Sequence, residues 1–244
     1  MVSEIRIYVE GGGDSRNTRS SFREGMSKFL ADIKRKANNR RVKFRIIVCG
    51  GRASTFNDFR KALKTHKTSL NILLVDSESP VNLPSFITPN AETERPMDQP
   101  TEAELEAKAK ANRKEMGQFA KQHLMKRVGD EWSMAGMEDE HIHLMVQVME
   151  SWVIADLEAL KKFYGSDFNS NAIPKNSNVE QISKQTIEKG LKQATRHCQK
   201  GEYHKINHGP QILGTVDTQL VRSKSKFCDR LFLTLSDLIQ GRVA

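Results

Sequence analysis

Four acidic residues stand where apolar, strand-like runs of the sequence give way to turns. Glu10 follows the alternating run IRIYV, and Asp76 and Glu78 follow the apolar run ILLV. Glu150 comes directly after the run MVQVM. Because ligands of an open parallel sheet bind at the carboxyl ends of its strands, we expect these acids to share one edge. Clustered carboxylates repel each other unless a cation neutralises them, which predicts a Mg²⁺ site, with Mn²⁺ as an alternative ion.

The elements that must position these acids alternate along the first part of the chain. Alternating apolar residues over 5–9 predict a strand, and apolar residues spaced three and four apart over 22–33 predict a helix. A second strand is predicted over 42–49, and Ser54 is expected to cap the helix that follows. The continuously apolar run 72–75 predicts a third strand that is buried on both faces. This strand–helix order implies a parallel sheet with right-handed crossovers.

The second half of the chain is predicted to add one strand and several helices. The proline-rich segment 80–100 is expected to form a long loop. The other predicted elements are a helix over 101–128, a strand over 141–148, a helix over 150–164, and C-terminal helices over 179–198, 211–216 and 223–239. We therefore expect an α/β domain with a mainly parallel four-stranded sheet over 1–168. A basic helical region over 169–244 is expected to pack on it.

The charge of the chain indicates a polyanionic partner. Its formal net charge is +9 and its pI is about 9.5, which favours nucleic acid. Arg52 follows the Gly50-Gly51 turn at the same predicted edge as the acids, where it could meet a scissile phosphate, although a surface role is equally open. A second candidate set for phosphate contacts consists of Arg196, Lys200, Lys205, Arg222 and Lys224. No aromatic residues alternate with this set, so it gives no evidence of base reading.

Several other classes of protein are disfavoured by the sequence. Cys49, Cys198 and Cys228 are odd in number and have no CxxC spacing, which argues against a disulfide framework or a zinc site. His141 and His143 are expected to share a strand face, but two histidines without a nearby cysteine do not predict a metal site. No apolar run is long enough to cross a bilayer, and the N-terminus has no signal-peptide pattern. We expect a cytoplasmic protein without a membrane partner.

Two of the strand ends resemble those of the Toprim domain, which occurs in topoisomerases, primases and nucleases. The matching segments are IYVEG, which contains Glu10, and ILLVDSE, which contains Asp76 and Glu78. The resemblance implies a Toprim-like (Rossmann-like) fold. It also implies that Glu10 acts as a general acid/base or metal ligand, and that the acid pair binds a divalent metal. The sequence departs from the family pattern at Glu78, where the family has aspartate, so the carboxylate stands one methylene further out.

A narrower resemblance covers most of the chain. The segments VEGGGDS, CGGR and MVQVMESWVIADLEAL resemble a bacterial family of Toprim-like nuclease effectors, of which AriB of the PARIS anti-phage defence system is a member. The resemblance implies a nuclease that cuts tRNA, is held by an ABC-type ATPase partner and acts as a homodimer after release. It also implies that Glu150, and with it Asp156, lies near the active site. The helical pattern places Asp156 in the middle of a helix.

Three functions are consistent with these features. The first is a Mg²⁺-dependent endonuclease in which Glu10, Asp76 and Glu78 are both catalytic and metal-binding, with Glu150 as a further metal ligand. RNA, tRNA in particular, and DNA present the same phosphates, so both classes of substrate stay open. The second is a regulatory or nucleic-acid-binding subunit of an ATPase complex that has no activity of its own. The third is nucleotidyl transfer, as in primases.

Overall fold

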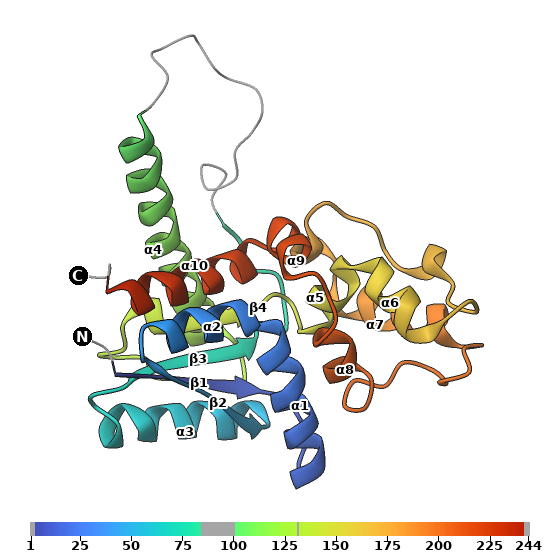
Figure 1. Ribbon diagram of the computed structural model, residues 1–244, viewed down its shortest axis with the longest axis horizontal. Helices are drawn as coiled ribbons and strands as arrows, with labels where there is room; N and C mark the ends of the chain where they lie inside the picture. Colours follow the sequence, from blue (N-terminus) through green and yellow to red (C-terminus); the bar gives the residue numbers. More distant parts are fainter. Residues whose placement is uncertain (1–2, 84–100, 131, 242–244) are drawn as a thin grey trace.

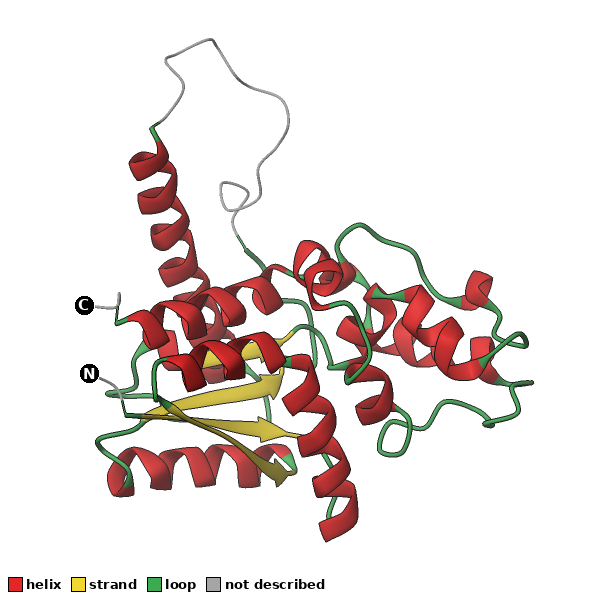
Figure 2. Cartoon of the chain, in the orientation of Figure 1, coloured by secondary structure: helices red, strands yellow, loops and turns green. Residues whose placement is uncertain are grey.

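Four parallel strands form the sheet that the sequence predicts. The computed structural model describes residues 3–83, 101–130 and 132–241. The strands are β1 (Glu4–Glu10), β2 (Lys43–Gly50), β3 (Leu70–Asp76) and β4 (Ile142–Met145), and their order in the sheet is β2-β1-β3-β4. All three pairings between neighbours are parallel (Figures 1 and 2). The predicted α/β fold is confirmed, and β1 and β3 lie side by side at the centre of the sheet.

Helices cover both faces of this sheet. On one face lie α1 (Arg16–Phe29), α2 (Ala31–Asn39) and α10 (Lys226–Gln240). On the other lie α3 (Arg52–Thr65) and α4 (Glu102–Lys126). Because side chains alternate along a strand, Ile7 and Val9 of β1 pack in the first layer, whereas Tyr8 packs in the second with Phe59. The helical crossovers on these faces make the strands parallel, so their carboxyl ends lie at the same edge of the sheet.

The rest of the helices lie beyond the carboxyl ends of the strands. They are α5 (Glu150–Ala155), α6 (Leu157–Tyr164), α7 (Lys184–Thr195), α8 (Gly209–Leu213) and α9 (Thr218–Lys224), with short 3₁₀ turns η2 (Asp139–His141), η3 (Ser170–Ala172) and η4 (Val179–Gln181). Figure 1 shows the strand arrowheads pointing toward α5 and α8. Leu160 and Leu191 belong to the same apolar cluster as Val9 and Leu74, so this helical part shares a core with the sheet. Among the described residues, no helix is long and apolar enough to cross a membrane.

Two predicted helices are divided where a polar side chain begins a new helix. The prediction of one helix over 150–164, with Asp156 at its middle, was wrong. Asp156 is the N-cap of α6 and accepts hydrogen bonds from the backbone N–H groups of Ala159 at 3.1 Å and Asp217 at 2.8 Å. Similarly, Ser225 caps α10 and separates it from α9 within the predicted 223–239 helix. Capping groups satisfy the open N–H groups of the new first turn, which stabilises the break.

Other boundaries also differ from the sequence predictions. The predicted helix over 22–33 is divided at Leu30, and α3 begins at Arg52 after Gly51, not at a Ser54 cap. β4 is shorter than the predicted 141–148 at both ends, because His141 belongs to η2 and residues 146–148 leave the sheet. Residues 84–100 of the predicted loop lie outside the described residues. Thr101 then starts α4 with a capping box formed with Glu104.

Arg230 of α10 joins the second helical layer to the sheet. Its side chain is 2% exposed and donates hydrogen bonds to the carbonyls of Arg113 at 2.9 Å, Ile142 at 2.7 Å and Asp139 at 2.8 Å. Burial lowers the pKa of Arg230 to about 10, so it remains charged at neutral pH. One guanidinium group thus satisfies carbonyls in α4, β4 and η2 at once.

We expect the substitution Arg230→Met to destabilise the fold by about 3 kcal/mol, because it removes a charged donor that three carbonyls in and beside the core share. Equilibrium urea unfolding measures this change. The matched control is Arg60→Met, at an exposed position of α3, for which a loss below about 1 kcal/mol is expected. Equal losses for the two variants would contradict the role assigned to Arg230.

Candidate metal centre

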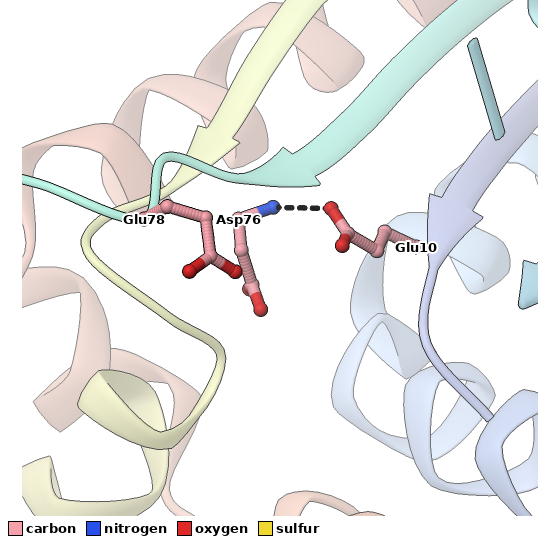
Figure 3. A group of neighbouring side chains, drawn as sticks. All are labelled: Glu10, Asp76 and Glu78. Carbon is pink, nitrogen blue, oxygen red and sulfur yellow. Dashed lines mark hydrogen bonds between the residues drawn. The ribbon is translucent and has the colours of Figure 1, made fainter. Parts of the chain in front are cut away.

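The three acids predicted from the strand ends meet at one point of the sheet. Glu10 is the last residue of β1, Asp76 is the last residue of β3, and Glu78 follows two residues later. One carboxylate oxygen from each lies within 4.8 Å of the others. Figure 3 shows the three side chains converging, with the backbone N–H of Asp76 donating to Glu10 Oε2 at 3.1 Å. Three hard oxygen donors at this spacing could hold one divalent cation.

Glu78 reaches this cluster through an unusual backbone conformation. Its φ is +66°, in the left-handed region that a residue with a Cβ rarely adopts. The Glu78 N–H donates to the carbonyl of Gln147 at 2.8 Å, which holds the conformation in place. Such a conformation costs on the order of 1–2 kcal/mol for a non-glycine residue, so the surrounding contacts must compensate for it. The turn directs the longer side chain of Glu78 back toward Asp76 (Figure 3).

Burial and mutual repulsion disfavour the charged forms of two of these acids. Burial is the main cause that raises the pKa of Glu10 to about 7, and the charge of Asp76 adds to it, while Arg52 opposes the shift. Burial likewise raises the pKa of Asp76 to about 6 against the opposing charge of Lys205. The donor set therefore has the chemistry of a cation site, because a bound cation would remove the unfavourable repulsion.

Arg52 is fixed against Glu10 by a second set of contacts. Its Nη1 lies 3.3 Å from Glu10 Oε2 and also donates to the carbonyl of Asp76. Its Nε and Nη2 donate to Asp130 at 2.9 and 2.7 Å, and its guanidinium lies 4.8 Å from the centre of the Trp132 ring. Arg52 thus lies at the acid cluster, as its place after the second strand predicts. Most of its donors are engaged within the protein.

Two lysines from the C-terminal helical part neutralise the other acids. Lys205 Nζ lies 3.1 Å from Asp76 Oδ2 and 3.4 Å from Glu150 Oε2. Although burial disfavours its charged form, these two carboxylates raise the pKa of Lys205 above its ordinary value. Lys184 Nζ, in the first residue of α7, lies 2.6 Å from Glu78 Oε2. Of the C-terminal residues predicted to contact phosphate, Lys205 is the one that pairs with Asp76, and 45% of its side chain is exposed.

Glu150 lies next to the cluster but outside the group of three. Its side chain is 2% exposed and accepts a hydrogen bond from the Tyr203 hydroxyl at 3.0 Å. Its other oxygen faces Lys205. Asp156 has a structural role, because both of its carboxylate oxygens accept hydrogen bonds from backbone N–H groups. Metal ligation by Glu150 stays a prediction. In the structure, Glu150 and Asp76 both pair with the ammonium of Lys205.

The remaining residues predicted to contact phosphate lie away from the acids. Lys224 Nζ donates to the carbonyl of Ala155 at 2.8 Å, and Arg222 pairs with Asp229 at 2.7 Å. Lys200 lies 5.1 Å from the centre of the Phe163 ring, and both Lys200 and Arg196 are exposed. Two members of the predicted set are thus used for internal contacts, and nucleic-acid binding by the set stays a prediction.

The histidines and cysteines take structural positions. His143 is fully buried, and its ring contacts the carbonyl of Glu140 at 2.9 Å and Arg230 at 3.2 Å. His141 lies in η2, so the two histidines do not share a strand as predicted. The three cysteines are buried and unpaired. These positions agree with core roles for His143 and the cysteines.

Four residues of this region were not singled out by sequence reasoning: Asp130, Trp132, Lys184 and Tyr203. Each contacts a predicted site residue from a segment that is distant in the chain. Their spacing carried no signal. Only the position of Asp130 and Trp132 in a short polar segment between the α4 helix and the fourth strand could have drawn attention to them.

The fold and the acid cluster together define an α/β protein with a candidate cation site at the carboxyl edge of a parallel sheet. A family model described as "Domain of unknown function (DUF4276)" matches residues 9–236, and the chain belongs to this family. Neither the curated proteins nor the solved structures gave a match.

The raised pKa of Glu10 predicts that removing its charge stabilises the protein without metal. The folded-state pKa, about 7, lies above the ordinary value of 4.5, so the stability of the folded state falls as pH rises between these values. At pH 8 in EDTA we expect Glu10→Gln to unfold about 4 °C above the wild type by calorimetry. At pH 4 the difference should vanish, because Glu10 is then protonated in both states.

The control for this measurement is Glu24→Gln, an exposed acid of α1 that pairs with Lys28. This variant is expected to gain nothing at pH 8. A Glu10→Gln variant that unfolds at or below the wild-type temperature at pH 8 would show that Arg52 outweighs the repulsion in the cluster.

Proposed function

We propose that this chain is a divalent-metal-dependent endonuclease of the Toprim type that hydrolyses phosphodiester bonds in nucleic acid. The observation that supports the proposal is the convergence of Glu10, Asp76 and Glu78, with raised pKa values at Glu10 and Asp76. Buried acids with such pKa values, grouped at the ligand-binding edge of a parallel sheet, are characteristic of functional sites. The basic net charge supports a polyanionic substrate.

The three carboxylates would hold Mg²⁺, or Mn²⁺ in its place. When bound, the ion supplies polarisation of a phosphoryl oxygen and stabilisation of the leaving oxygen. Glu10 would either be a ligand of the ion or, where it stays outside the coordination shell, accept or donate the proton. Lys205, whose ammonium lies next to Asp76 and whose side chain is 45% exposed, would attract a phosphate oxygen. Arg52 orients Glu10 through its contacts with Asp130 and Trp132.

The resemblance to Toprim-like nuclease effectors extends the proposal to a biological setting. In that setting the substrate is RNA, with tRNA as the first candidate and DNA as the alternative. The chain would be a toxic effector of an anti-phage defence system in the cytoplasm. An ABC-type ATPase would restrain it, and it would act as a homodimer when released. These assignments rest on the sequence segments that carry the resemblance.

A second candidate function is a non-catalytic subunit of an ATPase complex. The observation that favours it is that each acid of the cluster already pairs with a cation of the chain: Glu10 with Arg52, Asp76 with Lys205 and Glu78 with Lys184. These pairs could satisfy the carboxylates without metal, and the cluster would then hold the helices on the sheet.

Cleavage of nucleic acid by the purified protein distinguishes the two functions. We expect total tRNA to be cut in Mg²⁺ and to stay intact in EDTA, with plasmid DNA tested in parallel. Glu10→Gln and Asp76→Asn should each lower the cleavage rate by about 10²–10⁴-fold, because they remove a metal ligand or proton-transfer group. Rates are measured by gel densitometry at pH 8.

The control for these variants is Glu106→Gln, an exposed acid of α4, which should cleave at the wild-type rate. A wild-type protein that neither cleaves any of these nucleic acids nor gains thermal stability in Mg²⁺ would favour the non-catalytic subunit. Cleavage that persists at the wild-type rate in both Glu10→Gln and Asp76→Asn would place the active site elsewhere.

A further inference from the structure

Two adjoining surface depressions lie along α1, α2 and the outer edge of β2. The first is lined by Arg23, Lys28, Lys34 and Arg35 among others, and the second by Arg6, Arg23, Lys34 and Arg45 among others. They share Arg23, Ser27 and Lys34, so they form one continuous surface. Six cationic side chains line this surface. Glu24 is the one carboxylate among the described residues that line it. Lys28 neutralises that carboxylate at 2.7 Å.

The charge at the centre of this surface is not neutralised by the protein. Arg6 and Arg45 pair with Glu4, and Arg35 pairs with Asp32. By contrast, Arg23 and Lys34 form no ion pair with any described carboxylate. Arg23 Nε donates to the carbonyl of Ile46 at 3.2 Å, and Lys34 Nζ contacts the Ser27 hydroxyl at 3.2 Å. Both residues are exposed, so their charges face solvent and can attract an anion.

The surface continues to the acid cluster through the first turns of α1. Arg19 stands one helical turn before Arg23 and donates to the carbonyl of Gly13, in the turn that follows Glu10. The Arg19 guanidinium also lies beside Gly50, the last residue of β2, and it is close enough that a Cβ at Gly50 would collide with it. Figure 1 shows α1 beside the arrowheads of β1 and β2. A row of three cations thus runs from the carboxyl edge of the sheet along β2, and it consists of Arg19, Arg23 and Lys34.

We infer that Arg19, Arg23 and Lys34 form a basic track that binds the sugar–phosphate backbone of the nucleic acid on its way to the acid cluster. From Gly50 to Arg45 the strand spans about 17 Å, which is long enough to contact successive phosphates of one nucleic-acid strand. A linear row of cations fits a polymer of regularly spaced phosphates better than it fits one small anion. The inference rests on the proposed nucleic-acid substrate, and it assigns the backbone contact to α1 and α2, in addition to the C-terminal basic residues.

Binding measured without metal tests the track separately from cleavage. The probe is a fluorescein-labelled single-stranded RNA in EDTA, followed by fluorescence anisotropy over a range of salt concentrations. The double substitution Arg23→Gln with Lys34→Gln should weaken binding about tenfold at moderate salt. It should also reduce the slope of log K against log salt by about 1.4, which is two phosphate contacts on a single strand.

The matched control is Arg60→Gln with Lys61→Gln, two exposed cations of α3 on the opposite face of the sheet. This pair should bind the RNA with the wild-type affinity and slope, and circular dichroism should show both double variants folded. Wild-type affinity and slope in the Arg23/Lys34 variant would overturn the inference. So would an equal loss in the two double variants, or binding of phosphatidylserine vesicles that depends on Arg23 and Lys34 while RNA binding does not.

The outcomes also separate this inference from the proposed function. RNA that binds in EDTA through Arg23 and Lys34 but is never cut in Mg²⁺ would support the track and contradict the nuclease. RNA that is cut in Mg²⁺ and bound equally well by the Arg23/Lys34 variant would contradict the track alone.

Discussion

The burial of neighbouring carboxylates at the ends of β1 and β3 is the constraint on which much of this structure depends. Glu10 and Asp76 are brought together because their strands are neighbours, and neither can ionise at low cost without a nearby positive charge. The chain supplies that charge from three separate segments, through Arg52, Lys184 and Lys205. The ion pairs that neutralise these carboxylates thus help to hold the C-terminal helices against the sheet, together with the shared apolar core.

The parts that the sequence predicts well depend on short-range patterns and simple topology. Alternation in 5–9 and the apolar run at 72–75 identify the central strands, and the order of elements makes them parallel. The carboxyl ends of parallel strands share an edge, so the meeting of Glu10 and Asp76 follows without any knowledge of side-chain packing. Glu78 is included because it lies only two residues further on.

The parts that the sequence does not predict depend on contacts between distant segments. Lys184 and Glu78 are 106 residues apart in the chain, and Lys205 and Asp76 are 129 apart. No local spacing marks such pairs. The helix break at Asp156 was missed for a related reason, since its second oxygen accepts a hydrogen bond from the N–H of Asp217, the residue that caps α9. The helical pattern of apolar residues continues past Asp156, so it does not reveal the break. The hydrogen bond from Asp217 comes from a distant segment.

The internal partners of Asp76 and Glu78 have a consequence for how any added ion binds. Lys205 and Lys184 already hold oxygens that a divalent ion would contact, so binding is an exchange in which ammonium groups leave the carboxylates. The measured affinity would then be a difference between two ionic interactions, and it would be weaker than three unpaired acids would give. Because the two binding events are coupled, a ligand that draws Lys205 away from Asp76 would increase the occupancy of the ion site. A phosphate group has the charge to do this.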